Sequence, residues 1–239
     1  MANEFFEPGA QRATKVRSLF DRIARRYDLI NDIQSCGLHR LWKRKVVHLA
    51  NVQDGDRALD LCCGTGDLAQ RIQQAGAKVV GLDFSTEMLN HATKRAAKLS
   101  NISFVRADAQ KLPFHDETFD IVTAGYGLRN LADWEVGLAE MNRVLKSGGR
   151  MVVLEFGRPN GLIWRSVYFA YLKLFVPILG LLFCGNAGAY SYILESLKNY
   201  AGHEAVVSKM QALGLPDAAN CSLLDSAMTI TYGSKRSAT

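Results

Sequence analysis

Short apolar segments alternate with longer amphipathic ones from Val52 to about Phe156. The short segments span residues 57–62, 78–83, 102–108, 119–125 and 150–156. Runs of this length and composition predict buried strands. Strands that alternate with helices predict a parallel sheet with helices on both of its faces. The expected fold class is therefore α/β.

Two of the intervening segments predict helices in detail. After Ser85, one side of the segment carries Met88, Leu89, Ala92, Ala96 and Leu99. After Asp133, a favourable N-cap residue, the apolar positions are Leu138, Met141 and Leu145. The glycines of "KSGG" at 146–149 are expected to end this second helix.

Two regions fall outside the alternation and define the expected domain organisation. Residues 1–50 predict a helical N-terminal arm, whose apolar side carries Phe20, Ile23, Tyr27 and Ile30 at helical spacing. Residues 51–239 form the main domain, within which 161–213 predict a helical insertion. Residues 222–235 predict a closing antiparallel hairpin with Asp225–Ser226 at its turn.

The most apolar part of the insertion is residues 166–184. A membrane-spanning helix needs about 20 apolar residues. This run, however, contains Lys173, and Pro177 and Gly180 are expected to break or kink a helix. Buried helices or an apolar lid are therefore favoured over a membrane span.

The net charge of +6 is unevenly distributed along the chain. Residues 1–50 contain ten lysines and arginines and five acidic residues, so this region alone supplies +5. A solvated helix face explains the pattern, and contact with an anionic surface is the alternative. Because the chain has no zinc-finger spacing and no RNA-recognition signature, we expect no nucleic acid partner and favour a membrane as that surface.

The N-terminal stretch "MANEFFEPGA" has acidic residues and no long apolar core, so it does not resemble a secretory signal. Five cysteines show no disulfide or zinc spacing, and we interpret them as free thiols in a reducing cytoplasm. The adjacent Cys62 and Cys63 have no cysteine or histidine nearby in the sequence. No metal site is expected.

The segment "RALDLCCGTGDLA", residues 57–69, predicts a strand that enters a glycine turn and then a helix. The strand ends in Asp60, and the turn contains Gly64, Thr65 and Gly66, where glycines let backbone N–H groups approach a ligand closely. Asp83 ends the next strand, where a carboxylate can accept hydrogen bonds from both hydroxyls of a ribose. The pattern therefore predicts a nucleoside at the carboxyl ends of the sheet.

Dinucleotide-dependent and methyl-donor-dependent enzymes share this arrangement. A dinucleotide site favours G-x-G-x-x-G, whereas here those positions hold Cys62, Gly64 and Leu68. Aligned instead from Gly64, the pattern ends on Ala69, which is only weakly compatible. Asp67 follows the turn at once and would repel a pyrophosphate. An acidic rim suits the sulfonium and amino groups of S-adenosylmethionine better.

A third acidic residue supports the methyl donor. Asp108 follows the third strand and can accept a hydrogen bond from the adenine amino group, while Ala109 offers a backbone N–H to the ring. Acidic residues at three successive strand ends favour S-adenosylmethionine over NAD. A helix N-cap is the alternative role for each of them taken singly. An NAD-dependent oxidoreductase is thus the alternative from a different class of enzyme.

Longer motifs make the chain similar to a known family. "YDLINDIQSCGLHRLWK" (27–43) resembles the signature Y-D-x-M-N-x-x-x-S-x-G-x-H-x-x-W of the ubiquinone/menaquinone biosynthesis C-methyltransferase family. The family's "FGLRN" appears here as "YGLRN" (126–130), and its "RVLKPGGxxxxLEFS" as "RVLKSGGRMVVLEFG" (143–157). The similarity extends from about Leu19 to Leu215.

The resemblance implies a class I S-adenosylmethionine-dependent methyltransferase fold, with a Rossmann-like, mostly parallel sheet of seven strands. It also implies C-methylation of a polyprenylated quinol, either demethylmenaquinol to menaquinol or a methoxy-benzoquinol of the ubiquinone pathway. Family cofactor positions fall on Thr65, Asp83, Asp108 and Ala109. Another falls on Gly125, where the family usually has serine, so that only the backbone of this residue is available.

Methylation of a ring carbon requires a phenolate, whose charge makes the adjacent carbon nucleophilic. Arg129 is our candidate for stabilising that anion, because a guanidinium stays charged, and a structural salt bridge is its alternative role. Asn130 is expected to hydrogen-bond the second ring oxygen. Tyr27 and Asp28 match family positions near the acceptor, with a core position and a helix cap as their alternatives. His39 is a titratable candidate that more often packs or lies at the surface, and the base stays unassigned.

The apolar run 161–184 and the basic arm suggest how an insoluble isoprenoid substrate is collected. We expect an apolar lid that docks on anionic lipid at the inner face of the membrane, while the protein itself is cytoplasmic. A subunit interface is the alternative use of such a surface, so an oligomer stays open. The remaining alternatives for function are a methyltransferase for another small molecule or phospholipid headgroup and a catalytically silent cofactor-binding subunit.

Overall fold

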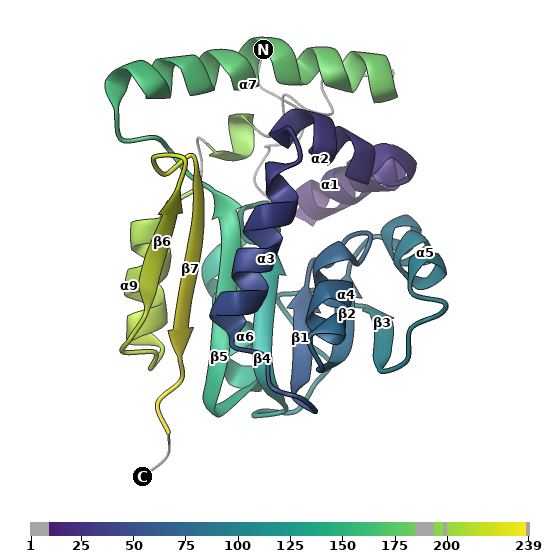
Figure 1. Cartoon of the computed structure of the whole chain (residues 1–239), viewed down its shortest axis with the longest axis vertical. Coiled ribbons are helices and arrows are strands. Elements are labelled where there is room, and N and C mark those ends of the chain that lie inside the picture. The colour runs from purple at the N-terminus through teal and green to yellow at the C-terminus, as the bar shows by residue number, and fades with distance from the viewer. Residues whose placement is uncertain (1–9, 185–193, 198–199, 238–239) are drawn as a thin grey trace.

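The computed structural model of the chain describes residues 10–184, 194–197 and 200–237, with side chains for 17–182, 194–197 and 200–237. Parts of the expected arm and insertion, residues 1–9, 185–193 and 198–199, lie outside this description, as do 238–239. The described elements form a sheet between two helical layers, and further helices lie across the carboxyl ends of its parallel strands (Figure 1).

Seven strands of the described chain form one sheet in the order β3-β2-β1-β4-β5-β7-β6 (Figure 1). They are β1 (Arg57–Leu61), β2 (Lys78–Asp83), β3 (Ile102–Arg106), β4 (Phe119–Gly125), β5 (Leu145–Phe156), β6 (Ala219–Leu223) and β7 (Met228–Ser234). Strands β1 to β5 are parallel, and β7 pairs antiparallel with β5 and β6. The expected mostly parallel, seven-stranded sheet is therefore confirmed. Strand order reverses between β1 and β4, where open α/β sheets bind their ligands.

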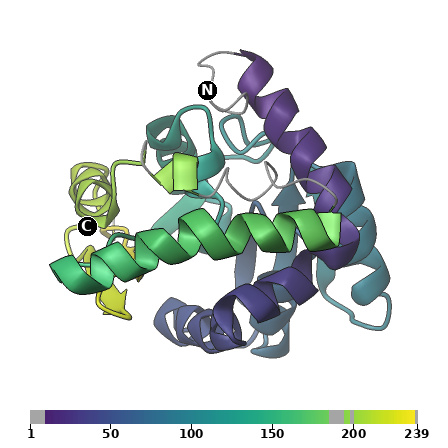
Figure 2. The same cartoon turned by 90° about the horizontal axis from the view of Figure 1, so that it is seen from above.

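Helices cover both faces of the sheet and the carboxyl ends of its parallel strands. One face carries α3 (Leu38–Ala50) and α4 (Asp67–Gln74), the other carries α6 (Trp134–Val144) and α9 (His203–Ala212), and α5 (Thr86–Arg95) packs beside β3. The carboxyl ends of the parallel strands lie beneath α1 (Ala10–Ile23), η2 (Ala24–Arg26), α2 (Tyr27–Ser35) and α7 (Leu162–Cys184) (Figures 1 and 2). A short helix, η3 (Leu128–Asn130), follows β4.

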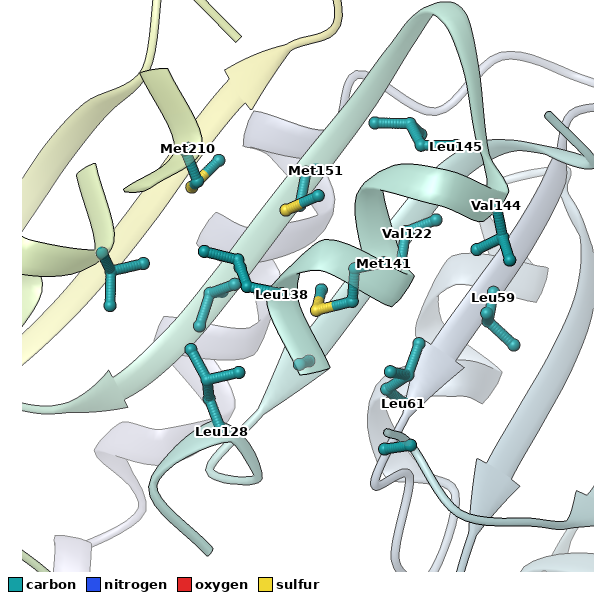
Figure 3. Packing of buried hydrophobic residues seen from close by; sticks show 14 of the residues in the cluster. Leu59, Leu61, Val122, Leu128, Leu138, Met141, Val144, Leu145, Met151 and Met210 are labelled. Atoms are coloured by element: carbon teal, nitrogen blue, oxygen red, sulfur yellow. The ribbon is translucent and has the colours of Figure 1, made fainter. Parts of the chain in front are cut away.

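The core follows from the apolar periodicity of the sequence. Leu138 and Met141 of α6 are fully buried against Val122 and Met151 of the sheet (Figure 3). On the opposite face, residues of α3 and α4 form a second cluster with β1, β2 and β4. Because the central strands are buried on both faces, their sequences are continuous apolar runs rather than alternating ones.

Two local predictions are confirmed. Asp133 caps α6, since its Oδ1 accepts the backbone N–H groups of Glu135 at 2.9 Å and Val136 at 3.1 Å. Strands β6 and β7 form the expected antiparallel hairpin. Its turn contains Asp225 and Ser226, which both have positive φ angles.

The prediction that "KSGG" ends the second helix is wrong. Helix α6 already ends at Val144, because Leu145 adopts an extended conformation and begins β5. The glycines lie inside that long strand, where its register with β4 shifts between Phe119 and Ile121. Gly148 has a φ of +76°, and a Cβ on Gly149 would lie 2.8 Å from a carbonyl of β4. The glycines thus provide the positive φ and the close backbone contact that this irregularity of the sheet requires.

Of the break or kink expected at Pro177 and Gly180, the break is absent, because α7 continues through both residues from Leu162 to Cys184. On its inner side Leu172, Val176 and Leu179 are buried. Their burial stabilises the helix and compensates for the backbone hydrogen bond that proline cannot make. By length and composition, residues 162–182 are sufficient to cross a membrane, and 22% of the most apolar window is buried in the protein. The helix lies across the end of the sheet with its outer side uncovered (Figure 2).

Candidate active site

Two adjoining cavities lie at the carboxyl ends of the strands. The nucleoside cavity, of about 110 Å³, is lined among others by Gly64, Asp83, Asp108, Ala109 and Asn130. The apolar cavity, of about 300 Å³, lies under α7 and is lined among others by Leu19, Trp42, Phe156, Tyr168 and Leu172. Phe20, Tyr27 and Tyr126 line both. The site therefore consists of a polar nucleoside cavity and an apolar cavity that share an aromatic wall.

The turn between β1 and α4 is shaped by backbone that few residues adopt. Cys62, Gly64 and Gly66 have φ angles of 51°, 55° and 76°. Glycine suits the positive φ of Gly66, where a Cβ would also lie only 3.1 Å from the Phe104 ring. Burial raises the pKa of the Cys62 thiol, which keeps it protonated and unreactive. The turn is a close-fitting backbone cradle.

Asp83, at the end of β2, is fixed by backbone donors. Its carboxylate accepts the N–H of Gly64 at 2.9 Å and that of Ser85 at 2.8 Å. Burial raises the pKa of Asp83, and these N–H groups oppose the rise. Asp108 and Ala109 follow β3 and line the same cavity. The structure thus brings these three sequence-predicted residues around one compartment.

Asp60, near the end of β1, is deeply buried, with 1% of its surface exposed. Its Oδ1 accepts the Thr123 hydroxyl at 2.7 Å, while its Oδ2 has no partner within the described part of the chain. Burial raises the pKa of Asp60 to about 7, although Thr123, Lys43 and the backbone N–H of Ala69 act to lower it. Together with Thr65 and Gly125 it lines a small hollow beside the nucleoside cavity. A buried carboxylate oxygen without a partner suits a cationic ligand group.

Arg129 lies in the wall of the apolar cavity. Its side chain is 4% exposed and forms an ion pair with the buried Glu155. It also donates to the Tyr126 carbonyl at 2.9 Å and to the Ser196 hydroxyl at 3.3 Å. The guanidinium carbon lies 4.7 Å from the centre of the Phe156 ring. The structural salt bridge foreseen as an alternative is therefore present, and the same side chain still faces the cavity.

The other residues expected near the acceptor lie in different places. Tyr27 lines both cavities, and burial raises its pKa to about 12. Asn130 lines the nucleoside cavity. Asp28 lines neither cavity, because it accepts the Thr65 hydroxyl at 2.8 Å and forms an ion pair with Arg95 of α5. Asp28 thereby ties the N-terminal helices to the glycine turn.

Tyr126 was missed by the sequence reasoning. It has a φ of 60°, which is strained for a non-glycine residue and aims its ring between the two cavities. Its hydroxyl is buried and has no partner among the described residues. The motif "YGLRN" contains the residue, but no spacing rule indicates a left-handed backbone. Across the described ranges, no group of three or more histidine, cysteine, aspartate or glutamate residues is placed to hold a metal ion.

The chain has close relatives among curated proteins. It is 41% identical over 213 residues to the ubiquinone/menaquinone biosynthesis C-methyltransferase UbiE of Azotobacter vinelandii, covering 87% of this chain and 84% of that one. The enzyme of the same name from Pseudomonas fluorescens is also 41% identical, with 87% and 83% covered. A sequence model of the ubiE/COQ5 methyltransferase family matches residues 9–235.

Solved structures share the fold at much lower identity. A SAM-dependent methyltransferase from Thermotoga maritima superposes with a TM-score of 0.64 at 18% identity, covering 92% of this chain and all of that one. The [4+2]-cyclase SpnF also reaches 0.64 at 18% identity, with 95% and 97% covered. A fold that includes a cyclase does not determine the reaction, so the sequence family decides. The chain belongs to the ubiE/COQ5 methyltransferase family and is an S-adenosylmethionine-dependent C-methyltransferase of quinone biosynthesis.

Proposed function

We propose that the protein methylates the ring of demethylmenaquinol to give menaquinol. The observation that carries this proposal is the apolar cavity, which adjoins the nucleoside cavity and shares Tyr27 and Tyr126 with it. A flat aromatic ring fits a compartment of about 300 Å³ with apolar walls. The methoxy-benzoquinol of the ubiquinone pathway is also an aromatic quinol with an apolar tail. Incubation with each quinol and labelled methyl donor separates the two acceptors.

The polar compartment fits S-adenosylmethionine, which supplies a methyl group on a positively charged sulfonium. Asp83 is proposed to hold the ribose hydroxyls, and Asp108 and Ala109 the adenine edge. Asp60, with its unpartnered Oδ2, is proposed to receive the amino group. The glycine turn with Thr65, and the backbone of Gly125, complete the cradle. S-adenosylmethionine supplies a cation for Asp60 Oδ2, which has no partner among the described residues, and ribose hydroxyls for Asp83.

Arg129 is proposed to stabilise the phenolate that makes the ring carbon nucleophilic. The ion pair with Glu155 is neutral overall, but in a low-dielectric wall the guanidinium N–H groups still stabilise negative charge that develops next to them. Asn130 lines the nucleoside cavity, where its amide donates to the Tyr126 carbonyl at 3.1 Å, and it is proposed to hydrogen-bond the second ring oxygen. The aromatic walls exclude water and hold the ring in place, and such positioning contributes on the order of 7–11 kcal/mol to the rate. Asp28 contributes indirectly, by holding Tyr27 over the glycine turn.

The outer side of α7 is proposed to dock on an anionic membrane, from which the acceptor is collected. It exposes Leu162, Ile163, Leu174, Ile178, Leu181 and Leu182. Its inner side lines the apolar cavity through Trp164 and Tyr168. Exposed arginines 22, 25 and 26 lie on α1 and η2, and α1 runs to the C-terminal end of α7 in the view from above (Figure 2). Apolar surface beside basic residues is the pattern of an interfacial helix.

The burial of Asp60 predicts an unusual pH dependence of stability. Its pKa is raised from 3.8 to about 7, so its stabilising contribution is complete below pH 3.8 and is lost as the pH rises through about 7. Asp60→Asn, which cannot ionise, should therefore be more stable than the cofactor-free wild type at pH 8 by about 4 kcal/mol, with little difference at pH 4. Urea unfolding at the two pH values measures this.

Asp120→Asn is the matched control for that experiment. Burial alone would raise the pKa of Asp120, but Lys146 and the Arg57 N–H outweigh it and lower the pKa. Asp120→Asn should therefore lose stability at pH 8, the opposite sign. Equal destabilisation of both variants at pH 8 would contradict the assignment of Asp60.

The acceptor is identified by incubating the purified protein with methyl-labelled S-adenosylmethionine and each quinol in detergent micelles. We expect label in menaquinol, and Arg129→Met should lower kcat about 100-fold while the affinity for the methyl donor stays unchanged. Because Arg129→Met leaves Glu155 buried and unpaired, the double variant with Glu155→Leu separates catalysis from folding. Label found only in the benzoquinol, or an active Arg129→Met enzyme, would refute the respective part of the proposal.

Membrane docking is measured by flotation with liposomes that contain anionic lipid. The wild type should float, and the variant Leu174→Glu with Ile178→Glu should stay in solution, since both positions lie exposed on the outer side of α7. Val136→Glu, at a position that is 43% exposed on α6, is the control and should float. A wild type that never floats would exclude docking, and a change of sedimentation coefficient in the double variant would indicate a subunit interface instead.

A further inference from the structure

We propose that His39 is the general base that takes the hydroxyl proton of the quinol, and that Asp32 positions it. The proposal rests on the proposed function, because it requires a ring hydroxyl in the apolar cavity. It assigns the base that neither the sequence motifs nor Arg129 supplies. His39 is 5% exposed and lines this cavity.

Asp32 fixes one side of the imidazole. His39 Nε2 lies 2.8 Å from Asp32 Oδ1, and the same carboxylate accepts Arg40 Nε at 2.8 Å and a terminal nitrogen of Arg40 at 2.5 Å. The two residues, seven positions apart, meet because Cys36 and Gly37 take left-handed conformations between α2 and α3. With Nε2 donating to Asp32, the lone pair of the neutral ring lies on Nδ1. This is the arrangement of an oriented base.

The other side of the imidazole lacks a partner. Nδ1 of His39 is buried and makes no hydrogen bond within the described part of the chain. Of the eight buried side-chain atoms with this property, Gln34 Oε1, His39 Nδ1 and the Tyr126 hydroxyl belong to residues that line the one apolar cavity. Buried polar groups are normally satisfied. Three unpartnered polar atoms around one apolar cavity indicate a ligand with polar groups of its own, as a quinol has.

The electrostatic surroundings keep His39 neutral. Burial lowers its pKa, as does Lys43, while Asp32 and Asp67 of α4 oppose the change. The remaining titratable or charged residues that line the cavity are Tyr27, Cys36, Tyr126, Arg129, Tyr168 and Tyr171. A ring that is neutral near pH 7 has a free lone pair for the acceptor proton.

The step conserves atoms and charge. The O–H bond of the hydroxyl next to the reacting carbon breaks, its proton moves to Nδ1, and its electron pair moves into the ring. The ring carbon then forms a bond to the methyl group as the carbon–sulfur bond breaks and sulfur keeps that electron pair. The same carbon loses its hydrogen as a proton when aromaticity returns, and the oxygen regains a proton. One proton is released per turnover.

The test is the pH profile of kcat/KM with the quinol that the wild type methylates. For the wild type we expect a tenfold fall per pH unit below the pKa of His39, which lies under 6.5. His39→Gln should lose about 100-fold in kcat together with this acid limb. His48→Gln, an exposed histidine on the same helix, is the control and should match the wild type.

Asp32→Asn gives a second measurement that does not depend on the folding of His39→Gln. Because Asp32 raises the pKa of His39, its loss should move the acid limb to lower pH and reduce kcat about 10-fold or more. A histidine NMR titration of the free protein should show the same downward shift of the His39 pKa, independently of turnover. Calorimetry should give an unchanged affinity of both variants for S-adenosylmethionine.

The outcomes separate the two proposals. An active wild type whose His39→Gln variant keeps kcat within threefold and the same acid limb would overturn the role of His39 alone. A wild type that methylates neither quinol would overturn the proposed function and, with it, this inference. Loss of activity in Asp32→Asn without a shift of the limb or of the NMR titration would show Asp32 to be structural and would overturn the assignment as well.

Discussion

The site depends on the burial of carboxylates at the ends of adjacent parallel strands. Asp60 and Asp83 lie where water cannot solvate them fully, and the pKa of each is raised by that burial. Backbone N–H groups compensate Asp83, but one oxygen of Asp60 has no partner among the described residues. The ligand-free protein is therefore destabilised at the point where the sheet reverses its strand order, and a cationic ligand removes this cost.

Much of the remaining structure forms the apolar cavity next to these buried carboxylates. Asp28 ties the N-terminal helices to the glycine turn through Thr65, and Tyr27 then forms a wall of both cavities. The ion pair with Glu155 holds the Arg129 guanidinium in the wall of the apolar cavity without exposing it to solvent. Helix α7 closes that compartment with one side and presents the other to the surroundings. Polar and apolar halves of the site are thus built by different parts of the chain.

Residues at strand ends were predictable, and residues whose position depends on turns were not. Since parallel strands end at the same edge, Asp83 and Asp108 had to converge once the strands were identified. Asp28 lines neither cavity and instead pairs with Thr65 and Arg95, which lie far along the sequence. The left-handed backbone of Tyr126, and the turn that joins His39 to Asp32, depend on tertiary packing. Periodicity and spacing carry no signal for either.

The most direct test of the carboxylate site is proton release on binding S-adenosylmethionine, measured by calorimetry at pH 6.5 in buffers of different ionisation enthalpy. With a pKa of about 7, Asp60 is mostly protonated in the free protein at this pH and must ionise to hold a cation. We predict release of more than half a proton per site in the wild type and none in Asp60→Asn. Binding without proton release, or equal release by the two proteins, would contradict the account.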